Sequence, residues 1–304
     1  MRILITGSKG LIGSALKHAL TLVGIDVIGI DIRANETDPE CGDILDKEHV
    51  VSLANTVDGV VHLAAVSRVI DGEKNPSLCW ETNVDGTENV LDAALLAYEK
   101  PWVIYASSRE VYGQPKDLPV AETAPLIPVN IYGKSKCAAE KAVEIASDKG
   151  LITSIVRFSN VFGSVHDHGD RVVPAFCRAS AEGFPIRVDG SHNIFDFTYL
   201  EDVVQGLLSL IHLLSQAKSS LPSIHFTSGR PMSLGEIAAI AQEASFHSIE
   251  IVEAPSRSFD VSQFWGDSSL ARELLNWRAC VSVEDGMARL INQYRLQRSL
   301  CQIL

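Results

Sequence analysis

The feature that most constrains the fold of this chain is the alternation of short apolar runs with longer helical patterns along its first half. The apolar runs cover residues 2–6, 26–30, 59–63, 102–107 and 152–158. Between them, helical patterns cover residues 11–23, 80–98 and 132–149. Short, nearly continuous apolar strands separated by helices are typical of a parallel sheet covered on both faces. We therefore expect an α/β fold built on a doubly wound, Rossmann-like parallel sheet.

A glycine-rich turn follows the first predicted strand and precedes the first predicted helix. Small residues let a backbone turn tightly and approach a pyrophosphate, whose charge the helix N-terminus stabilises. The spacing is G-x-x-G-x-x-G instead of the better-known G-x-G-x-x-G, and a tight structural turn is the alternative explanation. Because a strand precedes the turn and a helix follows it, we predict a dinucleotide site. The predicted contacts are Gly7, Gly10, Leu11, Ile12 and Gly13.

Asp31, which closes the second predicted strand, indicates which dinucleotide binds. A carboxylate at this position accepts hydrogen bonds from the ribose hydroxyls and repels a 2′-phosphate, which favours NAD over NADP. Arg33 follows closely and leaves NADP open, and a solvated aspartate at the strand end is the other alternative.

Beyond about residue 161 the pattern becomes less regular, with shorter strands and helices and a serine-rich connector at residues 215–223. We predict a dinucleotide-binding domain at residues 1–162, completed by a return segment at about residues 192–228. The remainder of residues 163–304 is predicted to form a smaller, less regular C-terminal lobe that binds the substrate.

Composition excludes several classes of function. The formal net charge is −12, whereas nucleic-acid binders usually carry a basic patch. No segment reaches the roughly 18 apolar residues that a membrane span needs. The six cysteines include no C-x-x-C pair, which predicts reduced thiols in a cytoplasmic protein instead of disulfides or zinc. Two histidines flank Asp167, but they lack a third partner and no metal site is expected.

The sharpest chemical signal is the pair Tyr132 and Lys136, which share one face of a predicted helix. A free phenol has a pKa of about 10 and is a poor base near neutral pH. A nearby ammonium and an oxidised nicotinamide would stabilise the phenolate and make Tyr132 a general base. Ser108, at the end of a predicted strand, would hydrogen-bond the same substrate oxygen. A chance pairing on a helix face and an ordinary turn serine are the alternatives.

Further motifs follow one another along the chain. They are T-G-S-K-G-L-I-G at residues 6–13, H-L-A-A at 62–65, N-V-D-G-T at 83–87, S-S-R-E-V-Y-G at 107–113, Y-G-K-S-K at 132–136, R-F-S-N-V-F-G at 157–163, D-F-T-Y-L-E-D-V at 196–203 and W-G-D-S-S-L-A-R-E-L-L-N-W at 265–277. In this combination the chain resembles the NAD-dependent epimerase/dehydratase family of extended short-chain dehydrogenases/reductases, and most closely its nucleotide-sugar 4-epimerases. The resemblance covers nearly the whole chain and implies a UDP-, dTDP- or GDP-sugar as substrate.

The resemblance also implies roles for individual residues. Tyr132 would be the base, with Lys136 on the nicotinamide ribose and Ser108 as a second hydrogen-bond donor. Further cofactor contacts would come from Asp43 and Ile44 at the adenine, from Ala64 with its neighbours Leu63 and Ala65 at the pyrophosphate, and from Asn83 near the nicotinamide.

For the substrate, the resemblance implies that Asn160 and Arg257 contact the diphosphate, although a solvated loop charge is the alternative for Arg257. The chain departs from the family at Phe195, because many members carry an arginine there that meets a phosphate. Loss of one bidentate contact would weaken the site unless Arg171 or Arg187 substitutes.

Glu110 bears on the type of reaction. By the resemblance, many 4-epimerases have a small or uncharged residue there, whereas dehydratases, decarboxylases and some 4-keto reductases place a glutamate beside the 4-ketone. Some dehydratases carry an aspartate before this glutamate, where Arg109 stands here. A glutamate that only hydrogen-bonds the backbone is the alternative.

We expect an NAD-dependent nucleotide-sugar 4-epimerase. Tyr132 would remove the O4 proton while hydride passes from C4 to NAD, and hydride would return to the other face of the 4-keto intermediate. The alternatives are a 4,6-dehydratase, a decarboxylase or a 4-keto reductase on the same fold and, more remotely, a non-catalytic NAD-sensing protein. The resemblance further implies a homodimer, in which the helices predicted at residues 80–98 and 132–149 pair across a two-fold axis.

Overall fold

The computed structural model describes residues 1–256 and 261–301 of the 304-residue chain. Its main sheet has the order β2-β1-β3-β4-β5-β9, and every neighbouring pair is parallel. The strands are β1 (Arg2–Thr6), β2 (Asp26–Ile30), β3 (Gly59–His62), β4 (Trp102–Ser108), β5 (Thr153–Phe158) and β9 (Ile224–Phe226). The predicted parallel sheet is confirmed, and the ends of its five predicted strands differ by at most one residue.

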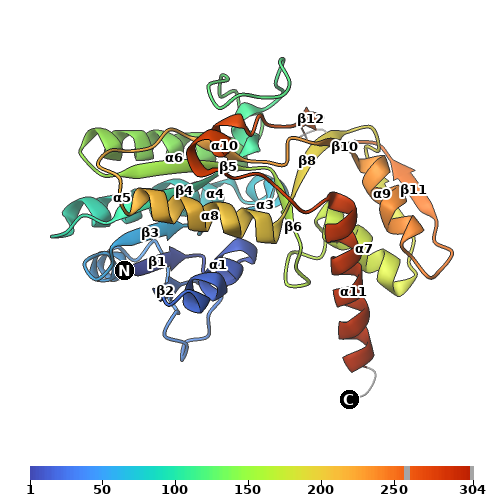
Figure 1. The fold of residues 1–304 in the computed structure, drawn as a ribbon, viewed down its shortest axis with the longest axis horizontal. Helices are drawn as coiled ribbons and strands as arrows, with labels where there is room; N and C mark the ends of the chain where they lie inside the picture. Colours follow the sequence, from blue (N-terminus) through green and yellow to red (C-terminus); the bar gives the residue numbers. More distant parts are fainter. Residues whose placement is uncertain (257–260, 302–304) are drawn as a thin grey trace.

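Helices cover both faces of this sheet (Figure 1). On one face, α1 (Leu11–Leu22) packs against α8 (Leu200–Leu214). The other face carries α2 (Lys47–Ala54), α5 (Gly86–Leu96) and α6 (Ile131–Asp148), and α3 (Val69–Lys74) packs against α6. Every residue of β3, β4 and β5 is buried, as expected for strands that are shielded on both sides.

The helix predicted at residues 80–98 starts earlier and is interrupted. It begins as α4 (Pro76–Trp80), continues as the π-helical turn η1 (Glu81–Asp85) and ends as α5. Asn75 sets the start, because its side chain accepts a hydrogen bond from the Leu78 N–H at 3.2 Å and a proline occupies the first helical position. Such π-helical turns recur at functional sites.

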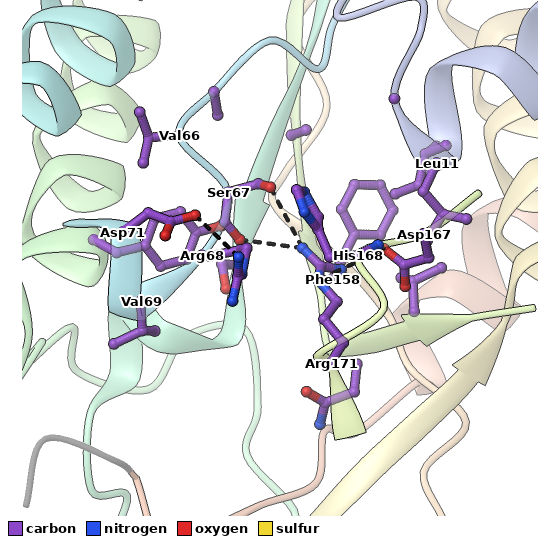
Figure 2. Close-up of a pocket in the computed structure, with 18 of the residues that line it drawn as sticks. Leu11, Val66, Ser67, Arg68, Val69, Asp71, Phe158, Asp167, His168 and Arg171 are labelled. Atoms are coloured by element: carbon purple, nitrogen blue, oxygen red, sulfur yellow. Dashed lines mark hydrogen bonds and ion pairs between the residues drawn. The ribbon is translucent and has the colours of Figure 1, made fainter. Parts of the chain in front are cut away.

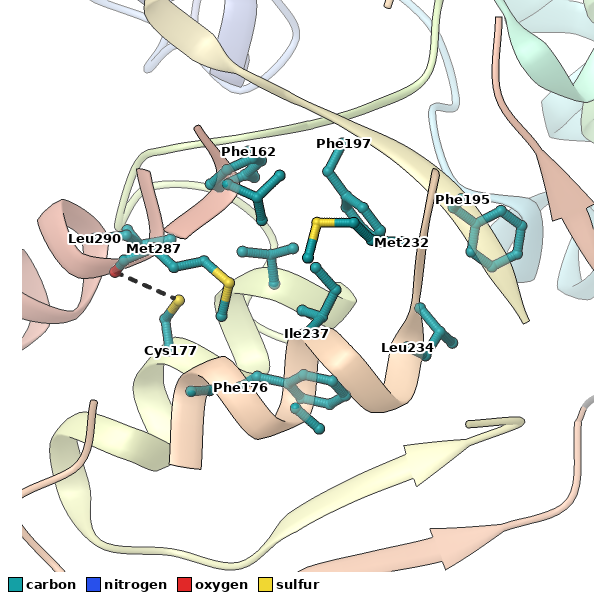
Figure 3. Close-up of a cluster of buried hydrophobic side chains, with 14 of the residues drawn as sticks. Phe162, Phe176, Cys177, Phe195, Phe197, Met232, Leu234, Ile237, Met287 and Leu290 are labelled. Atoms are coloured by element: carbon teal, nitrogen blue, oxygen red, sulfur yellow. Dashed lines mark hydrogen bonds between the residues drawn. The ribbon is translucent and has the colours of Figure 1, made fainter. Parts of the chain in front are cut away.

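The smaller lobe has the short strands that the sequence predicts, but the prediction of shorter helices is wrong for the last helix, which has 19 residues. Its central strand β8 (Ile194–Tyr199) pairs with β6 (Asn160–Phe162), β10 (Pro231–Ser233) and β12 (Gln263–Phe264), while β7 (Ile186–Asp189) pairs with β11 (Ile251–Ala254). The helices of this lobe are α7 (Val172–Glu182), α9 (Leu234–Glu243) and α11 (Val283–Cys301), whereas α10 (Ser269–Leu275) packs against α8 and β9 of the main sheet. Figure 3 shows the shared core, in which Phe176, Ile237 and Met287 come from three helices. This lobe therefore has a hydrophobic core of its own.

The chain returns to the main sheet after β8. Helix α8 packs on α1 and leads to β9, which pairs with β5. Residues 200–226 thus lie with the N-terminal half, whereas β8 belongs to the smaller sheet. The predicted boundary at residue 162 stays a prediction.

Candidate active site

A cavity of about 930 Å³ lies at the carboxyl ends of the parallel strands and is also lined by the smaller lobe. Ligands of open α/β sheets bind at this edge, and the volume is typical of a small-molecule site. Figure 2 shows part of the cavity, where Ser67 and Arg68, which follow β3, lie opposite His168 and Arg171, which precede α7.

The glycine-rich turn forms one end of the cavity. Gly7 has a φ of +71°, and a Cβ there would lie 2.8 Å from the Ala64 nitrogen, while a Cβ on Gly13 would lie 2.2 Å from the Gly7 oxygen. No side chain caps the N-terminus of α1, and its first turn holds no acidic residue, which leaves N–H groups for an anion. The turn therefore fits a dinucleotide pyrophosphate. The cavity is lined by all five predicted contacts, Gly7, Gly10, Leu11, Ile12 and Gly13.

Asp31 follows β2 and is buried at the same end of the cavity. Its Oδ2 accepts a hydrogen bond from the Lys9 N–H at 2.9 Å, and its Oδ1 accepts one from the Arg33 N–H at 2.8 Å. Burial acts to raise the pKa of Asp31, but the hydrogen bonds from Arg33 and Lys9 hold it below its ordinary value. The Arg33 guanidinium is itself paired with Asp31 at 3.1 Å. An ionised carboxylate with its cation already paired suits the free ribose of NAD better than a 2′-phosphate.

The other predicted cofactor contacts divide into two groups. Asp43, Ile44, Leu63, Ala64 and Ala65 line the cavity, whereas Asn83 is not part of its lining. The Asn83 side chain accepts from the Val66 N–H at 2.8 Å and donates to the Val66 carbonyl at 3.1 Å and to Ser135 Oγ at 2.9 Å. Asn83 thus fixes the segment after β3 against α6, and its contact with the cofactor stays a prediction.

The structure brings Ser108, Tyr132 and Lys136 together on the cavity wall. Ser108 ends β4, and the other two lie on α6. The first turn of α6 is held by a hydrogen bond from the Gly133 N–H to Asn130 Oδ1 at 2.8 Å. These three side chains and that of Glu110, the fourth predicted catalytic residue, are buried. Burial strongly affects the protonation of Tyr132 and Lys136.

Burial raises the pKa of Tyr132 to about 12. A side-chain hydrogen bond with Ser108 and the positive charge of Arg171 act in the opposite direction, while the Glu110 carboxylate adds to the increase. The phenol is therefore protonated at neutral pH, and its use as a base requires cations close by.

Lys136 brings one such cation. Its Nζ donates to the Ala106 carbonyl at 2.8 Å and lies 4.9 Å from the ring centre of Tyr105 and 6.0 Å from that of Tyr132. Burial lowers the pKa of Lys136 to about 8. The ammonium therefore remains mostly charged at neutral pH.

Glu110 lies in the 3₁₀ turn η2 (Arg109–Tyr112), directly after β4. One carboxylate oxygen, Oε1, forms an ion pair with Arg109 Nη2 at 2.9 Å. The other, Oε2, accepts a hydrogen bond from Asn130 Nδ2 at 2.8 Å. The carboxylate of Glu110 is thus held by two side chains. The alternative, a glutamate that only hydrogen-bonds the backbone, is not what the structure shows.

Sequence reasoning left Arg109 out of the site, although it stands between two residues that were included. The carbon of its guanidinium lies 4.4 Å from the ring centre of Phe195, and both residues line the cavity. The guanidinium that packs against Phe195 is thus supplied by Arg109. The predicted substitution by Arg171 or Arg187 stays a prediction.

Arg171 reaches across the cavity from the smaller lobe (Figure 2). Its Nη2 donates to the Ser67 carbonyl at 3.3 Å and to Ser67 Oγ at 3.4 Å. A neighbouring ion pair between Arg68 and Asp170 joins the same two segments. The positive charge of Arg171 also acts to lower the pKa of Tyr132.

The remaining predicted substrate contacts lie elsewhere on the cavity wall. Arg187, on β7, is exposed and pairs with Asp189 at 2.8 Å. Asn160, on β6, donates to the Asp196 carbonyl at 3.1 Å. Arg257 lies outside the described residues. The contacts of these three residues with a substrate stay predictions.

Asp167, which two histidines flank, forms an ion pair with Arg171 at 3.7 Å. In residues 1–256 and 261–301, no group of three or more His, Cys, Asp or Glu side chains is arranged to hold a metal ion. Nor does any helix in this part of the chain combine the length and apolar character needed to cross a membrane.

Comparison with known proteins identifies the family. The model of the NAD dependent epimerase/dehydratase family matches residues 3–221. A UDP-glucose 4-epimerase from Lactobacillus helveticus is 30% identical over 307 residues, which cover 91% of this chain and 92% of that protein. A UDP-glucuronic acid decarboxylase from Arabidopsis thaliana is 27% identical over 97% of this chain and 70% of its own length. The crystal structure of a dTDP-glucose 4,6-dehydratase from Streptomyces venezuelae with NAD bound has a TM-score of 0.88 at 26% identity, covering 99% of this chain and 98% of that chain.

These relatives have three different activities at nearly equal similarity. The comparison therefore identifies the family but does not distinguish among its reactions. From the family match and from a cavity whose glycine-rich end fits a dinucleotide, we conclude that the chain is an enzyme of the NAD-dependent epimerase/dehydratase family, with NAD as its cofactor.

Proposed function

We propose that this enzyme is a nucleotide-sugar 4-epimerase that acts through a 4-keto intermediate. The observation that carries the proposal is the state of Glu110, whose two carboxylate oxygens are held by Arg109 and Asn130. An enzyme that used this glutamate to take a proton beside the 4-ketone would need it free. Tyr132 and Ser108, in contrast, line the cavity as a hydrogen-bonded pair suited to one sugar hydroxyl.

In the proposed reaction, Tyr132 takes the proton from O4 of the sugar while Ser108 hydrogen-bonds the same oxygen. NAD, held at the glycine-rich turn and Asp31, would supply the acceptor for the C4 hydride and the donor for its return. Once the ketone has formed, protonated Tyr132 and Ser108 both donate to its oxygen, which stabilises the negative charge that develops there. Return of the hydride to the opposite face of the ketone would invert C4, while Tyr132 gives its proton back to O4.

The charges around Tyr132 support its role as the base. Burial raises its pKa to about 12 and opposes proton removal. Lys136 and Arg171 place positive charges near the phenol, and opposite charges favour the ionised form of a neighbouring acid.

The alternative reactions are elimination and decarboxylation, because Glu110 also lines the cavity. These reactions exchange carbon-bound hydrogen with solvent, whereas a 4-epimerase moves one hydride within one substrate. The test is to incubate the holoenzyme in D₂O with UDP-glucose, dTDP-glucose and GDP-glucose, and in parallel with UDP-glucuronic acid. We expect the 4-epimer without carbon-bound deuterium, as measured by NMR and mass spectrometry. Deuterium at C5 or C6 of the product, or release of CO₂, would overturn the proposal.

The nucleotide released on denaturation separates the 4-keto reductase from the other reactions. A recycling enzyme retains its cofactor, so we expect the purified protein to release stoichiometric NAD. An empty protein that binds NADPH more tightly than NAD would favour the reductase.

We also propose that the protein forms a homodimer in which α6 and the helix formed by α4, η1 and α5 pair across a two-fold axis, where Trp80 and Ile145 are exposed apolar residues. Sedimentation at micromolar concentration tests this, and a monomer would exclude it. The cytoplasmic location stays a prediction.

A further inference from the structure

Arg109 carries a charge that the proposed reaction does not use. It directly follows Ser108 as the first residue of η2, and its side chain is only 12% exposed. Nη2 of its guanidinium is paired with Glu110 Oε1 at 2.9 Å. Nη1 is buried and has no hydrogen-bond partner within the part of the chain that the structure describes.

An unpaired buried donor on a charged group is unfavourable, and in native structures it requires an explanation. Phe195 supports the guanidinium through its ring, at 4.4 Å. Such a contact orients an arginine without using any of its N–H groups. Both side chains line the cavity. Arg109 is therefore held in place while the N–H groups of Nη1 stay available for a ligand. A planar guanidinium with free donors matches the two oxygens of a carboxylate or phosphate.

The neighbours of Arg109 indicate which part of the substrate it meets. Ser108 lies directly before it and hydrogen-bonds Tyr132, the proposed base. Glu110 lies directly after it and acts on the pKa of the same tyrosine. Arg109 is therefore at the reacting end of the cavity, and a substituent close to C4 is the group within its reach.

We propose that Arg109 binds an oxyanion of the substrate, and that this oxyanion is a carboxylate on the sugar, so that the substrate is a nucleotide-linked uronic acid. The inference rests on the proposed function, since it assumes a nucleotide sugar in this cavity. A neutral hydroxymethyl group on C5 leaves the free donors of Arg109 without an anionic partner, whereas a carboxylate at that carbon satisfies them. The diphosphate offers the same oxyanion chemistry, and the experiment separates these two sources.

The experiment measures binding by titration calorimetry to the NAD-loaded protein in a Tyr132→Phe background, which prevents turnover. The ligands are UDP, UDP-glucose and UDP-glucuronic acid. The variants are Arg109→Gln and Arg109→Lys, and the matched control is Arg230→Gln, because Arg230 is an exposed arginine paired with Glu284 outside the cavity lining. Circular dichroism verifies that each variant is folded. If Arg109→Gln does not fold, Arg109→Lys serves as the test variant, because it keeps the positive charge but lacks the planar guanidinium.

We expect UDP-glucuronic acid to bind about 10- to 100-fold more tightly than UDP-glucose, the range for a charge-assisted hydrogen-bond pair. Arg109→Gln should abolish this preference, Arg109→Lys should reduce it, and Arg230→Gln should preserve it. Equal weakening of all three ligands by Arg109→Gln would support an oxyanion site with the diphosphate as its source. Unchanged binding of all three in Arg109→Gln would overturn this inference alone. If the parent protein binds none of the three UDP ligands and neither dTDP-glucose nor GDP-glucose, the proposed function is overturned and this inference with it.

Discussion

Two charged side chains lie one turn apart on α6, and their surroundings differ sharply. Glu140 is fully buried and receives two hydrogen bonds from Arg157, Nε to Oε1 at 2.9 Å and Nη2 to Oε2 at 2.6 Å. Lys136 is equally buried, but its ammonium donates to the neutral carbonyl of Ala106. Burial lowers the pKa of Lys136 to about 8. For Arg157 burial acts in the same direction, but the Glu140 carboxylate outweighs it and raises the pKa above its ordinary value.

The difference separates a structural charge from a functional one. A buried ion pair with bidentate geometry neutralises itself, and losing one partner leaves an uncompensated charge in the interior. A buried cation that meets a neutral acceptor keeps its electrostatic influence for a neighbour, and strongly shifted groups of this kind cluster at active sites. On this basis, we assign Lys136 to the active site and Glu140 to the structural contact between α6 and β5.

The largest expected effect is the loss of catalysis when Tyr132, which lies one turn before Lys136 on α6, is changed. Tyr132→Phe should lower kcat by about 10²- to 10⁴-fold, the usual contribution of a general acid–base residue. The free energy of unfolding should change little, because the ring that fills the site is retained. Steady-state kinetics and urea denaturation measure the two quantities. Activity within a few-fold of the wild type would remove Tyr132 from its proposed role.

A change at the structural residue Glu140 should mainly affect stability. Glu140→Gln leaves the Arg157 charge unpaired and should lower the free energy of unfolding by about 3–5 kcal/mol. The matched control is Lys141→Gln on the same helix, which removes an exposed ion pair with Glu144 and should leave the free energy of unfolding nearly unchanged. Urea denaturation compares the variants. Equal stability of the two would contradict a structural role for the Glu140–Arg157 pair.

A smaller effect concerns stability against pH. The pKa of Lys136 is about 8 in the folded protein and 10.5 as its ordinary value. Between these pH values the unfolded chain binds more protons, so the contribution of Lys136 makes the folded protein more stable as pH rises. Lys136→Met should remove this contribution. Denaturation of both proteins across the interval measures it, and parallel curves would show that Lys136 is not buried as described.

The smallest expected effect is that of Ser108→Ala. Loss of one hydrogen bond to the reacting oxygen should lower kcat by about 10-fold. Because the hydrogen bond with Ser108 lowers the pKa of Tyr132, its loss should also move the acidic limb of the kcat–pH profile to higher pH. A pH–rate profile that stays in place would show that Ser108 does not act on the base.

Much of the fold could be predicted because its strands are locally determined. Each of the five predicted strands is a short apolar run bounded by polar residues or turns, and burial on both faces selects this pattern. The helix predicted at residues 80–98 was wrong in its extent. Its start depends on the cap at Asn75, and its π-helical turn carries Asn83, whose hydrogen bonds to Val66 and Ser135 come from distant segments.

The sequence by itself determined the parallel sheet, the glycine-rich turn and the placement of Tyr132 and Lys136 on one helix face. These features depend on backbone geometry within a few residues, so spacing alone defines them. Only the tertiary structure decided that Asn130 holds Glu110 and that Arg109 rests on Phe195. It also decided that Arg171 reaches Ser67 across the cavity. The physical reason is that these contacts join segments far apart in the chain, and their meeting depends on how the two hydrophobic cores hold the lobes on either side of one cavity.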